Sequence, residues 1–484
     1  MIETTRKHRG VHAGRLGIRL AAIGVLGAMC LLLPVRSAFA GALRVRNING
    51  AGSSNPTNLA DAGGTLYFSA DDGTHGLEPW LSNGTFAGTH QIRDVRSGAI
   101  GSSPRDFTAA QTPAGDTVFF AATDGVHGEE LWKTDGTFAG TKMVKDIWSG
   151  PSSGYQANIV PVPEHNMVVF VAQDGTHGYE LWKSNGTAAG TTMIRDIDPN
   201  GGNGLTSQPE DRPVDIGGEV YFSAFEGFHG SELWKTDGTT AGTKFVKNIA
   251  PGAQNSQPRE FINLNGTLLF HADDGSHGDE LWKSDGTSTG TTLVKDIDPS
   301  FYSSVVSDYE MTKVGNGVFF RATDSGVNPG HGLELWRTNG TTAGTLRVKD
   351  INPGSADSMP DFLANVSGKL FFSADDGANG QELWKSNGLG SGTSMVKNIN
   401  GTAAGSYPTQ IVNDAGTAVF TVCEPTDGCE PWESDGSPVG THVLTNIAPG
   451  NASSTPDHLT VSNGLVFFSA ADQFSDRELW KATP

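Results

Sequence analysis

Histidine recurs at one spacing in this chain, five residues before a tryptophan, and histidine is the side chain best suited to proton transfer or metal ligation near neutral pH. Three copies of the same pattern carry Asn379, Asp427 or Ser475 instead. Equivalent residues of a repeat lie far apart, whereas metal ligands must lie within about 2.0–2.3 Å of one ion. We therefore favour histidines that hydrogen-bond their own turns over a metal site. The six are His75, His127, His177, His229, His277 and His331.

A second set of residues that could do chemistry is acidic and follows a loop proline at the start of a predicted strand. Carboxylates that converge at the mouth of a channel could bind Ca²⁺ or a basic ligand, because hard cations prefer oxygen ligands. Ordinary turn chemistry in a Ser-x-Pro-x-Asp loop is the interpretation we favour. The set comprises Asp106, Asp211, Glu260, Asp308, Asp361 and Asp457.

The elements that must position these residues belong to a repeat of about fifty residues. Nine of the ten tryptophans fall 48 to 54 residues apart, and only Trp148 breaks the spacing. Text such as EELWKTDGTFAGT, at 129–141, returns around each of the nine. We expect these tryptophans to be structural residues that pack between repeat units. They are Trp80, Trp132, Trp182, Trp234, Trp282, Trp336, Trp384, Trp432 and Trp480.

Each copy offers four short strand candidates, named a to d in chain order, which are separated by turn residues. In the fifth copy they lie at 258–262, 268–270, 280–283 and 293–297. Asp-Gly and Asn-Gly between such runs indicate hairpins, and no sustained helical period of apolar residues follows residue 40. Four antiparallel strands in about fifty residues form a propeller blade. We predict an all-β fold, a single β-propeller domain over residues 41–484.

The two ends of the repeat region complement each other. Residues 43–48 match strand d, whereas the ninth copy stops after strand c. The N-terminal strand is therefore predicted to complete the last blade and to close the ring, which removes two exposed sheet edges. The expected number of four-stranded blades is about nine, above the usual four to eight.

The repeated text resembles a bacterial family of exported proteins, the ELWxxDGT-repeat proteins. The resemblance covers nearly all of the chain after residue 40, and it implies a repeat protein without implying an activity. The later copies depart from the pattern. Leu389 breaks DGT in the seventh copy, and Glu430-Pro431-Trp432 replaces ELW in the eighth.

The first forty residues have the pattern of a secretory signal peptide. Basic residues precede an apolar run at 20–33, and Ala38-Phe39-Ala40 forms a cleavage signal. The run is too short for a convincing membrane span. We expect cleavage after Ala40, no transmembrane segment in the mature chain, and a periplasmic, cell-surface or secreted protein. An uncleaved anchor is the alternative.

The charge of the remaining chain bears on its partners. Residues 41–484 hold 27 Lys and Arg against 52 Asp and Glu, a net charge of −25. Nucleic acid needs a basic surface, so this balance argues against it. Cys423 and Cys429 flank the b–c turn of the eighth copy. An exported chain can oxidise such a pair, and we predict a disulfide there.

No catalytic motif stands out: G-x-S-x-G, H-E-x-x-H and a phosphate loop are all lacking. Residues that break the repeat are the remaining candidates for an active site, although plain variation explains each of them. These are Trp148, His165, Arg212, His271 and Arg321, together with the enlarged loop 325–330.

We favour an exported, non-enzymatic binding or surface protein that recognises a protein, a glycan or a cation through the face bearing the histidine and acidic positions. A glycan hydrolase or lyase is the first alternative, with paired carboxylates such as Glu260 and Asp308 at the channel mouth. A calcium-stabilised structural module is the second. The fold alone does not choose among them, and the sequence implies no cofactor besides Ca²⁺ and no particular oligomeric state.

Overall fold

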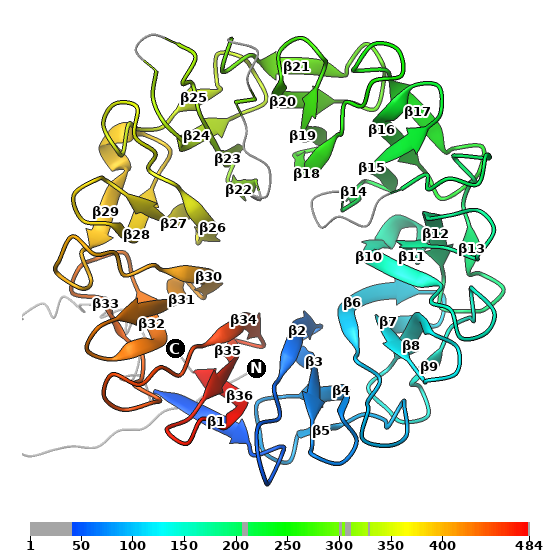
Figure 1. Cartoon of the computed structure of the whole chain (residues 1–484), viewed down its shortest axis with the longest axis horizontal. Coiled ribbons are helices and arrows are strands. Elements are labelled where there is room, and N and C mark those ends of the chain that lie inside the picture. The colour runs from blue at the N-terminus through cyan, green and yellow to red at the C-terminus, as the bar shows by residue number, and fades with distance from the viewer. Residues whose placement is uncertain (1–40, 206–211, 300–302, 305–310, 328–329, 483–484) are drawn as a thin grey trace, which may run out of the picture. The chain divides into compact units, whose positions relative to one another are not determined.

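The computed structural model describes residues 41–205, 212–299, 303–304, 311–327 and 330–482. From Gly41 onward they form nine four-stranded antiparallel sheets arranged in a ring, so the predicted all-β propeller is confirmed (Figure 1). The described residues include two 3₁₀ turns, η1 (Pro163–His165) and η3 (Gly390–Gly392). Strand a of every blade lies innermost and strand d outermost (Figure 1).

The strands follow the predicted order a to d in each blade. Blades 1 to 3 are β2 (Thr57–Ala62), β3 (Thr65–Asp71), β4 (Leu77–Ser82), β5 (Thr89–Gln91); β6 (Arg105–Thr112), β7 (Gly115–Thr123), β8 (Glu129–Thr134), β9 (Lys142–Met143); and β10 (Tyr155–Val162), β11 (Met167–Ala172), β12 (Glu180–Ser184), β13 (Thr192–Met193). Blades 4 to 6 are β14 (Val214–Ile216), β15 (Glu219–Glu226), β16 (Gly230–Thr236), β17 (Lys244–Lys247); β18 (Arg259–Leu264), β19 (Thr267–Asp273), β20 (Asp279–Ser284), β21 (Thr292–Lys295); and β22 (Thr312–Val314), β23 (Gly317–Ala322), β24 (Glu334–Thr338), β25 (Leu346–Arg347).

Blades 7 to 9 complete the ring. They are β26 (Asp361–Val366), β27 (Lys369–Asp375), β28 (Gln381–Ser386), β29 (Ser394–Lys397); β30 (Thr409–Asp414), β31 (Thr417–Glu424), β32 (Gly428–Ser434), β33 (Thr441–Val443); and β34 (Asp457–Ser462), β35 (Leu465–Ala471), β36 (Arg477–Ala482), with β1 (Ala42–Arg46) in the place of strand d. Residues 43–48 were predicted to supply this strand, and β1 pairs with β36 from Ala42 opposite Ala482 to Arg46 opposite Leu479.

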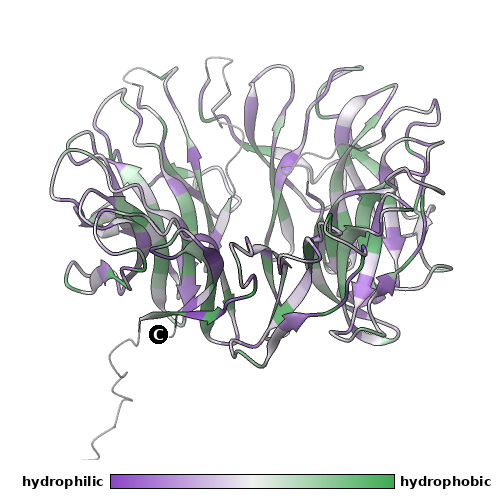
Figure 2. Ribbon diagram, turned by 60° about the horizontal axis from the view of Figure 1, so that its bottom comes forward, coloured by the Kyte–Doolittle hydropathy of each residue, from purple (hydrophilic) through white to green (hydrophobic). Residues whose placement is uncertain are grey.

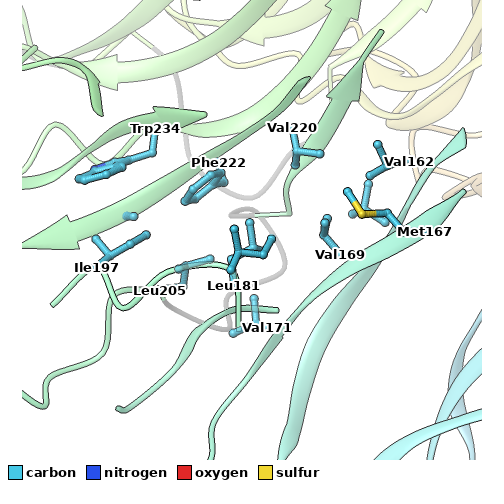
Figure 3. Close-up of a cluster of buried hydrophobic side chains, with 13 residues drawn as sticks. Val162, Met167, Val169, Val171, Leu181, Ile197, Leu205, Val220, Phe222 and Trp234 are labelled. Atoms are coloured by element: carbon cyan, nitrogen blue, oxygen red, sulfur yellow. The ribbon is translucent and has the colours of Figure 1, made fainter. Parts of the chain in front are cut away.

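The core lies between blades, because strand b is buried on both faces and each sheet packs on the next. In Figure 3, Met167, Val169 and Leu181 of blade 3 meet Val220, Phe222 and Trp234 of blade 4 in one buried cluster. The repeat tryptophan thus lies in an interface between blades. Apolar residues concentrate along the strands and polar residues along the loops (Figure 2). A separate cluster of this kind fills each of the nine blade interfaces.

A cation on strand d or just after it ties each of eight blades to the next. Lys145 of blade 2 shows the arrangement: its Nζ donates to the Thr191 carbonyl at 2.8 Å and lies 5.6 Å from the Trp182 ring, a cation–π distance. The eight cations are Arg46, Arg93, Lys145, Arg195, Lys247, Lys295, Lys349 and Lys397. Blade 8 has Thr445 at this position, facing blade 9.

A fully buried glutamate on strand c fastens the connection between blades. The Glu232 carboxylate accepts the backbone N–H groups of Ile249 (2.8 Å) and Ala250 (3.1 Å) and the Ser256 hydroxyl (2.7 Å). These donors lie 17, 18 and 24 residues along the chain, on the segment that leaves strand d for the next blade. The nine equivalents are Glu78, Glu130, Glu180, Glu232, Glu280, Glu334, Glu382, Glu430 and Glu478, all buried.

The last of these glutamates makes the same bonds across the ends of the ring. Glu478 accepts the N–H groups of Ile48 (3.0 Å) and Asn49 (3.4 Å) and the Ser54 hydroxyl (2.6 Å). Burial raises the pKa of these carboxyls although the three donors lower it, and the pKa is about 7 for Glu78, Glu130, Glu232, Glu280 and Glu334 and about 8 for Glu180.

Deletion of residues 41–48 from the chain that lacks residues 1–40 should unfold the ring cooperatively at a lower temperature. The deletion removes the buried side chains of Ala42, Val45 and Ile48, exposes the edge of β36, and takes the Ile48 N–H donor from Glu478. We expect a loss on the order of 5 kcal/mol from the apolar burial alone. Thermal unfolding by circular dichroism measures it against the chain that begins at Gly41. Equal midpoints would show that β1 does not close the ring.

Stability should fall as pH rises from about 4.5 to about 8. Between those values the folded state keeps protons on the raised glutamates that the unfolded chain has released, so unfolding becomes more favourable with pH. Urea titrations at pH 5 and pH 8 measure the difference. Glu334→Gln, which cannot titrate, should flatten the slope, and Glu164→Gln at an exposed carboxylate is the control. A stability that rises over this range would contradict the assignment.

Candidate functional site

The b–c turns and the connections from strand d to the next strand a share one face of the ring, which we call the histidine face. Leu77, at the end of the first b–c turn, forms a bridge with Gly101 of the following connection. The a–b and c–d turns form the opposite face.

Each of the six histidines braces its own b–c turn. In blade 1 the Oδ1 atom of Asp72 accepts the N–H groups of Thr74 (2.8 Å) and His75 (2.9 Å), and Oδ2 lies 2.8 Å from Nδ1 of His75. The other histidine–acid pairs are His127 with Asp124, His177 with Asp174, His229 with Glu226, His277 with Asp274 and His331 with Asp324. This is the turn role that the sequence favoured.

In blade 1 the histidine and the aspartate shift each other's pKa in opposite directions. The hydrogen bond to Asp72 raises the pKa of His75, and Asp94 on strand d adds to it. Partial burial would raise the pKa of Asp72, but the bonds from His75 and Thr74 lower it overall. In blade 6 the equivalent acid is Asp350, whose Oδ2 atom lies 3.9 Å from Nε2 of His331. In blades 1, 2, 5 and 6 the imidazole thus lies between a turn acid and an acid that follows strand d, whereas blade 4 has Asn248 at the second position.

The copies without histidine close the same turn by other means. Asn379 donates its side-chain N–H to Asp376 at 2.8 Å and its backbone N–H at 2.9 Å. In blade 8 the Asn446 amide donates to Asp427 at 2.8 Å. An amide replaces imidazole in blade 7 and a carboxylate replaces it in blade 8, so the shared requirement is a hydrogen bond made by the side chain at the histidine position. Over the ranges that the structure describes, no group of three or more His, Cys, Asp or Glu has a geometry that could hold a metal ion.

The acidic set does not occupy one equivalent position, contrary to the grouping made on the sequence. Asp106 and Glu260 stand two residues after their prolines, whereas Asp361 and Asp457 stand one residue after theirs. The second position has a left-handed backbone, with φ of +59° at Asp106 and +55° at Glu260. Phe362 (φ +51°) holds it in blade 7. Asp211 and Asp308 lie outside the described residues.

Each described acid of the set has its own partner within or beside its blade. Asp106 pairs with Arg105 at 2.6 Å and accepts the Tyr155 hydroxyl at 2.8 Å, and Arg105 in turn grips both oxygens of Glu129 at 2.9 Å. The contacts of the four described acids do not pair any two of them.

Glu260, Asp361 and Asp457 have partners of other kinds. Glu260 has a side chain only 4% exposed, and its carboxylate lies 3.1 Å from the buried His271 ring. Asp361 accepts the N–H of its own neighbour at 2.8 Å, and Asp457 accepts the Gln410 amide at 2.9 Å. Ordinary turn and ion-pair chemistry thus accounts for the contacts of all four.

The predicted disulfide is confirmed: Cys423 and Cys429 are bonded across the b–c hairpin of blade 8, with their Cα atoms 3.9 Å apart. The two residues lie directly opposite each other in the register of β31 and β32. The bond therefore staples the turn that lacks a histidine. It adds a covalent constraint where the imidazole brace is missing.

The variable residues of the histidine face lie at the tips of its turns. Just before the histidine position, the blades carry Thr74, Val126, Thr176, Phe228, Ser276, Ala378, Thr426 and Phe474. Phe228 is 82% exposed and Phe474 is 74% exposed. The connections add exposed Ile100, Met359 and Tyr407. Constant turns thus present tip side chains that change from blade to blade, from Thr and Ser to Phe.

The opposite face differs because its exposed positions are partly engaged by the ring itself. Phe86 and Phe138 lie 4.9 and 4.8 Å from the guanidinium groups of Arg46 and Arg93. Cavities of about 520, 390 and 330 Å³ open there, between and within neighbouring blades. The largest is lined by side chains that include Tyr67, Asp116 and Asp135. His165, one of the repeat-breaking residues, lines the second.

Comparisons with known proteins give a distant likeness of fold. No family model and no curated protein matches the chain. Solved structures with a similar trace include a puromycin-hydrolyzing peptidase of Mycobacterium tuberculosis (13% identity, TM-score 0.42, 86% of this chain and 57% of that one). A puromycin hydrolase (13%, 0.39, 88% and 60%) and prolyl oligopeptidase B of Galerina marginata (10%, 0.40, 90% and 55%) are similar to the same degree. The chain thus spans less than two thirds of their length, and these values carry no argument about function. Among the described residues, no helix is long and apolar enough to cross a membrane.

The histidine brace predicts a tolerant position. His127→Asn should leave the stability almost unchanged, because Asn379 makes the equivalent bonds in blade 7. His127→Ala, which leaves Asp124 without its side-chain partner, should lower the stability measurably. Urea unfolding at pH 6 compares the two variants. Equal losses in Asn and Ala would indicate that the imidazole has a role beyond closing the turn.

Proposed function

We propose that the protein is an exported, non-enzymatic binding propeller that recognises a protein or glycan ligand through its histidine face. The observation that carries the proposal is the alternation on this face between fixed braces and variable, exposed tips. Loops held by a rigid scaffold are where binding residues gather.

Backbone strain at the channel side of this face supports the same role. Residues directly before the loop prolines have left-handed φ values between +44° and +49°, Met359 and Tyr407 among them. Each such residue costs on the order of 1–3 kcal/mol, and strain of this kind gathers at ligand sites. In blades 7 and 8 it presents large, exposed side chains. The net charge of −25 over residues 41–484 favours neutral or basic partners.

The two alternatives rest on weaker observations. A glycan hydrolase or lyase needs two carboxylates at the channel mouth, about 5–10 Å apart, but Glu260 is buried against His271. A calcium-stabilised module would melt at a higher temperature with Ca²⁺ than with a chelator. An unchanged midpoint would argue against that alternative.

Export is part of the proposal. The basic residues, the apolar run at 20–33 and the Ala38-Phe39-Ala40 signal support cleavage after Ala40. The confirmed disulfide fits an oxidising compartment. Membership of the ELWxxDGT-repeat proteins is proposed on the repeat text alone.

Charged substitutions at the tips should abolish binding without unfolding the ring. We expect Phe228→Asp and Phe474→Asp to reduce binding at least tenfold on a glycan array and on whole cells of the producing organism, because each places a charge in an apolar contact. Val439→Asp, at a 92% exposed position on the opposite face, is the matched control.

A panel of glycosidase and lyase substrates is run beside the array. Turnover of any of these substrates by the unmodified protein would overturn the non-enzymatic assignment. Equal losses from the histidine-face and control variants would overturn the choice of face.

A further inference from the structure

The interface between blades 8 and 9 departs from the other eight in its charges. Eight blades send a Lys or Arg from strand d to a carbonyl of the next blade, and blade 8 has Thr445 there. Most blades also carry a Lys or Arg directly after the strand-c tryptophan, where blade 1 has Leu81 and blade 8 has Glu433. At no other boundary between blades are both cationic positions lost from the sequence.

The direction of Glu433 follows from its equivalents. Lys385, at the same place in blade 7, donates to the Gly436 carbonyl in the c–d turn of blade 8 at 2.7 Å. The position that matches Gly436 in blade 9 is residue 484, outside the described residues, and Gly41 lies on the other side of the same interrupted turn. Glu433 lies opposite Val419 in the sheet, and Val419 packs in one cluster with Ala42 of blade 9. Its side chain is only 3% exposed and also contacts His442 at 2.9 Å. A carboxylate therefore lies where blade 7 directs an ammonium group at its neighbour.

Blade 9 presents a different structure to that carboxylate. In blade 1 a continuous c–d turn joins Ser82 to Thr89, which pair across the strands. The same pair in blade 9 is Ala482 and Ala42, from the two ends of the propeller. The sequence AFAGA at 38–42 matches TFAGT at 85–89 and 137–141. The predicted cleavage after Ala40 thus falls inside the segment that corresponds to a c–d turn.

Gly41 lies against blade 8 with no room for a larger side chain. Its φ is +75°, a conformation that favours glycine. A Cβ atom built on Gly41 would lie 2.5 Å from Oγ1 of Thr445, so a larger residue would collide with blade 8. The next N–H, of Ala42, donates to the same Oγ1 at 2.7 Å.

We propose that the interface of blades 8 and 9 is the seat of the mature N-terminus, in which the α-ammonium group of Gly41 pairs with Glu433 beside Thr445. The inference rests on the proposed export and cleavage. A leader-cleaving peptidase hydrolyses the Ala40–Gly41 bond with one water, which leaves a carboxylate on Ala40 and an ammonium group on Gly41. The new cation supplies the charge that the other interfaces obtain from Lys or Arg. Removal of the leader thereby completes the last blade contact.

The experiment compares two starting points of the chain. One form begins at Gly41, and the other begins at Ser37, which moves the ammonium group four residues away. Glu433→Gln should lower the melting midpoint of the Gly41 form by about 2–4 °C and that of the Ser37 form by less than about 1 °C. Lys385→Gln is the control at the equivalent position of blade 7, and it should act equally in both forms. Thr445→Lys should raise the midpoint of the Ser37 form more than that of the Gly41 form.

Two results separate the parts of the proposal. The intact mass of the exported protein gives its first residue, and a start other than Gly41 would overturn the cleavage and the seat together. A start at Gly41 with equal effects of Glu433→Gln in both forms would overturn the seat and leave export intact. Neither result bears on ligand binding by the histidine face, which the tip variants test separately.

Discussion

The ring depends on nine buried carboxylates that would be costly anywhere else. A carboxylate taken from water into a protein interior is strongly destabilised unless hydrogen bonds replace its solvent. Here each glutamate finds two backbone N–H groups and, in seven blades, a serine hydroxyl at 2.6–2.8 Å. All three donors belong to the irregular segment between blades, whose buried N–H groups have no sheet partner. One side chain thus satisfies the polar backbone of a connection and fixes its path.

That constraint explains why the rest of the blade can vary. With the connection fixed, the next strand a starts at a defined place beside the channel, even though its first residues adopt strained left-handed conformations. The b–c turn is closed separately, by an aspartate with histidine in six blades and by other side chains elsewhere. Two independent sets of hydrogen bonds hold the two kinds of loop on the histidine face. The tip residue between Gly73 and His75 therefore contributes little to folding, and so do its equivalents. Such positions are free to differ between blades, as Thr74, Phe228 and Phe474 do.

Much of the fold was predictable from the sequence, because the blade sequence occurs in nine copies that can be compared. The four strands of the fifth copy lie at β18 to β21 within a few residues of their predicted places. The disulfide followed from two cysteines on one predicted hairpin. The role of the strand-c glutamate was missed, although Glu precedes the tryptophan by two residues in every copy. A charged residue that never varies on an otherwise apolar strand is a signal of a buried, hydrogen-bonded carboxylate.

The positions of the acidic set relative to the bulge in strand a were not predictable from the sequence. Asp106 and Asp361 look alike beside their prolines, yet one residue of offset puts them on different sides of a bulged strand. A left-handed residue near the start of strand a shifts the register with strand b, as between Arg105 and Thr108. Polar spacing alone does not reveal a bulge.

The departure at blades 8 and 9 was visible in the sequence only as two substitutions of no evident meaning. Both substitutions, Thr445 and Glu433, are explained once β1 is placed beside them, because a chain terminus carries a charge that an internal turn does not. Eight interfaces are built around a side-chain cation, and a ninth cation there would meet the ammonium group of Gly41 in a confined space. The missing cation at Thr445 and the reversed charge at Glu433 therefore follow from the same electrostatic requirement that the other interfaces meet with Lys and Arg. The interface of blades 8 and 9 therefore also contains a cation, once the α-ammonium group of the main chain is counted.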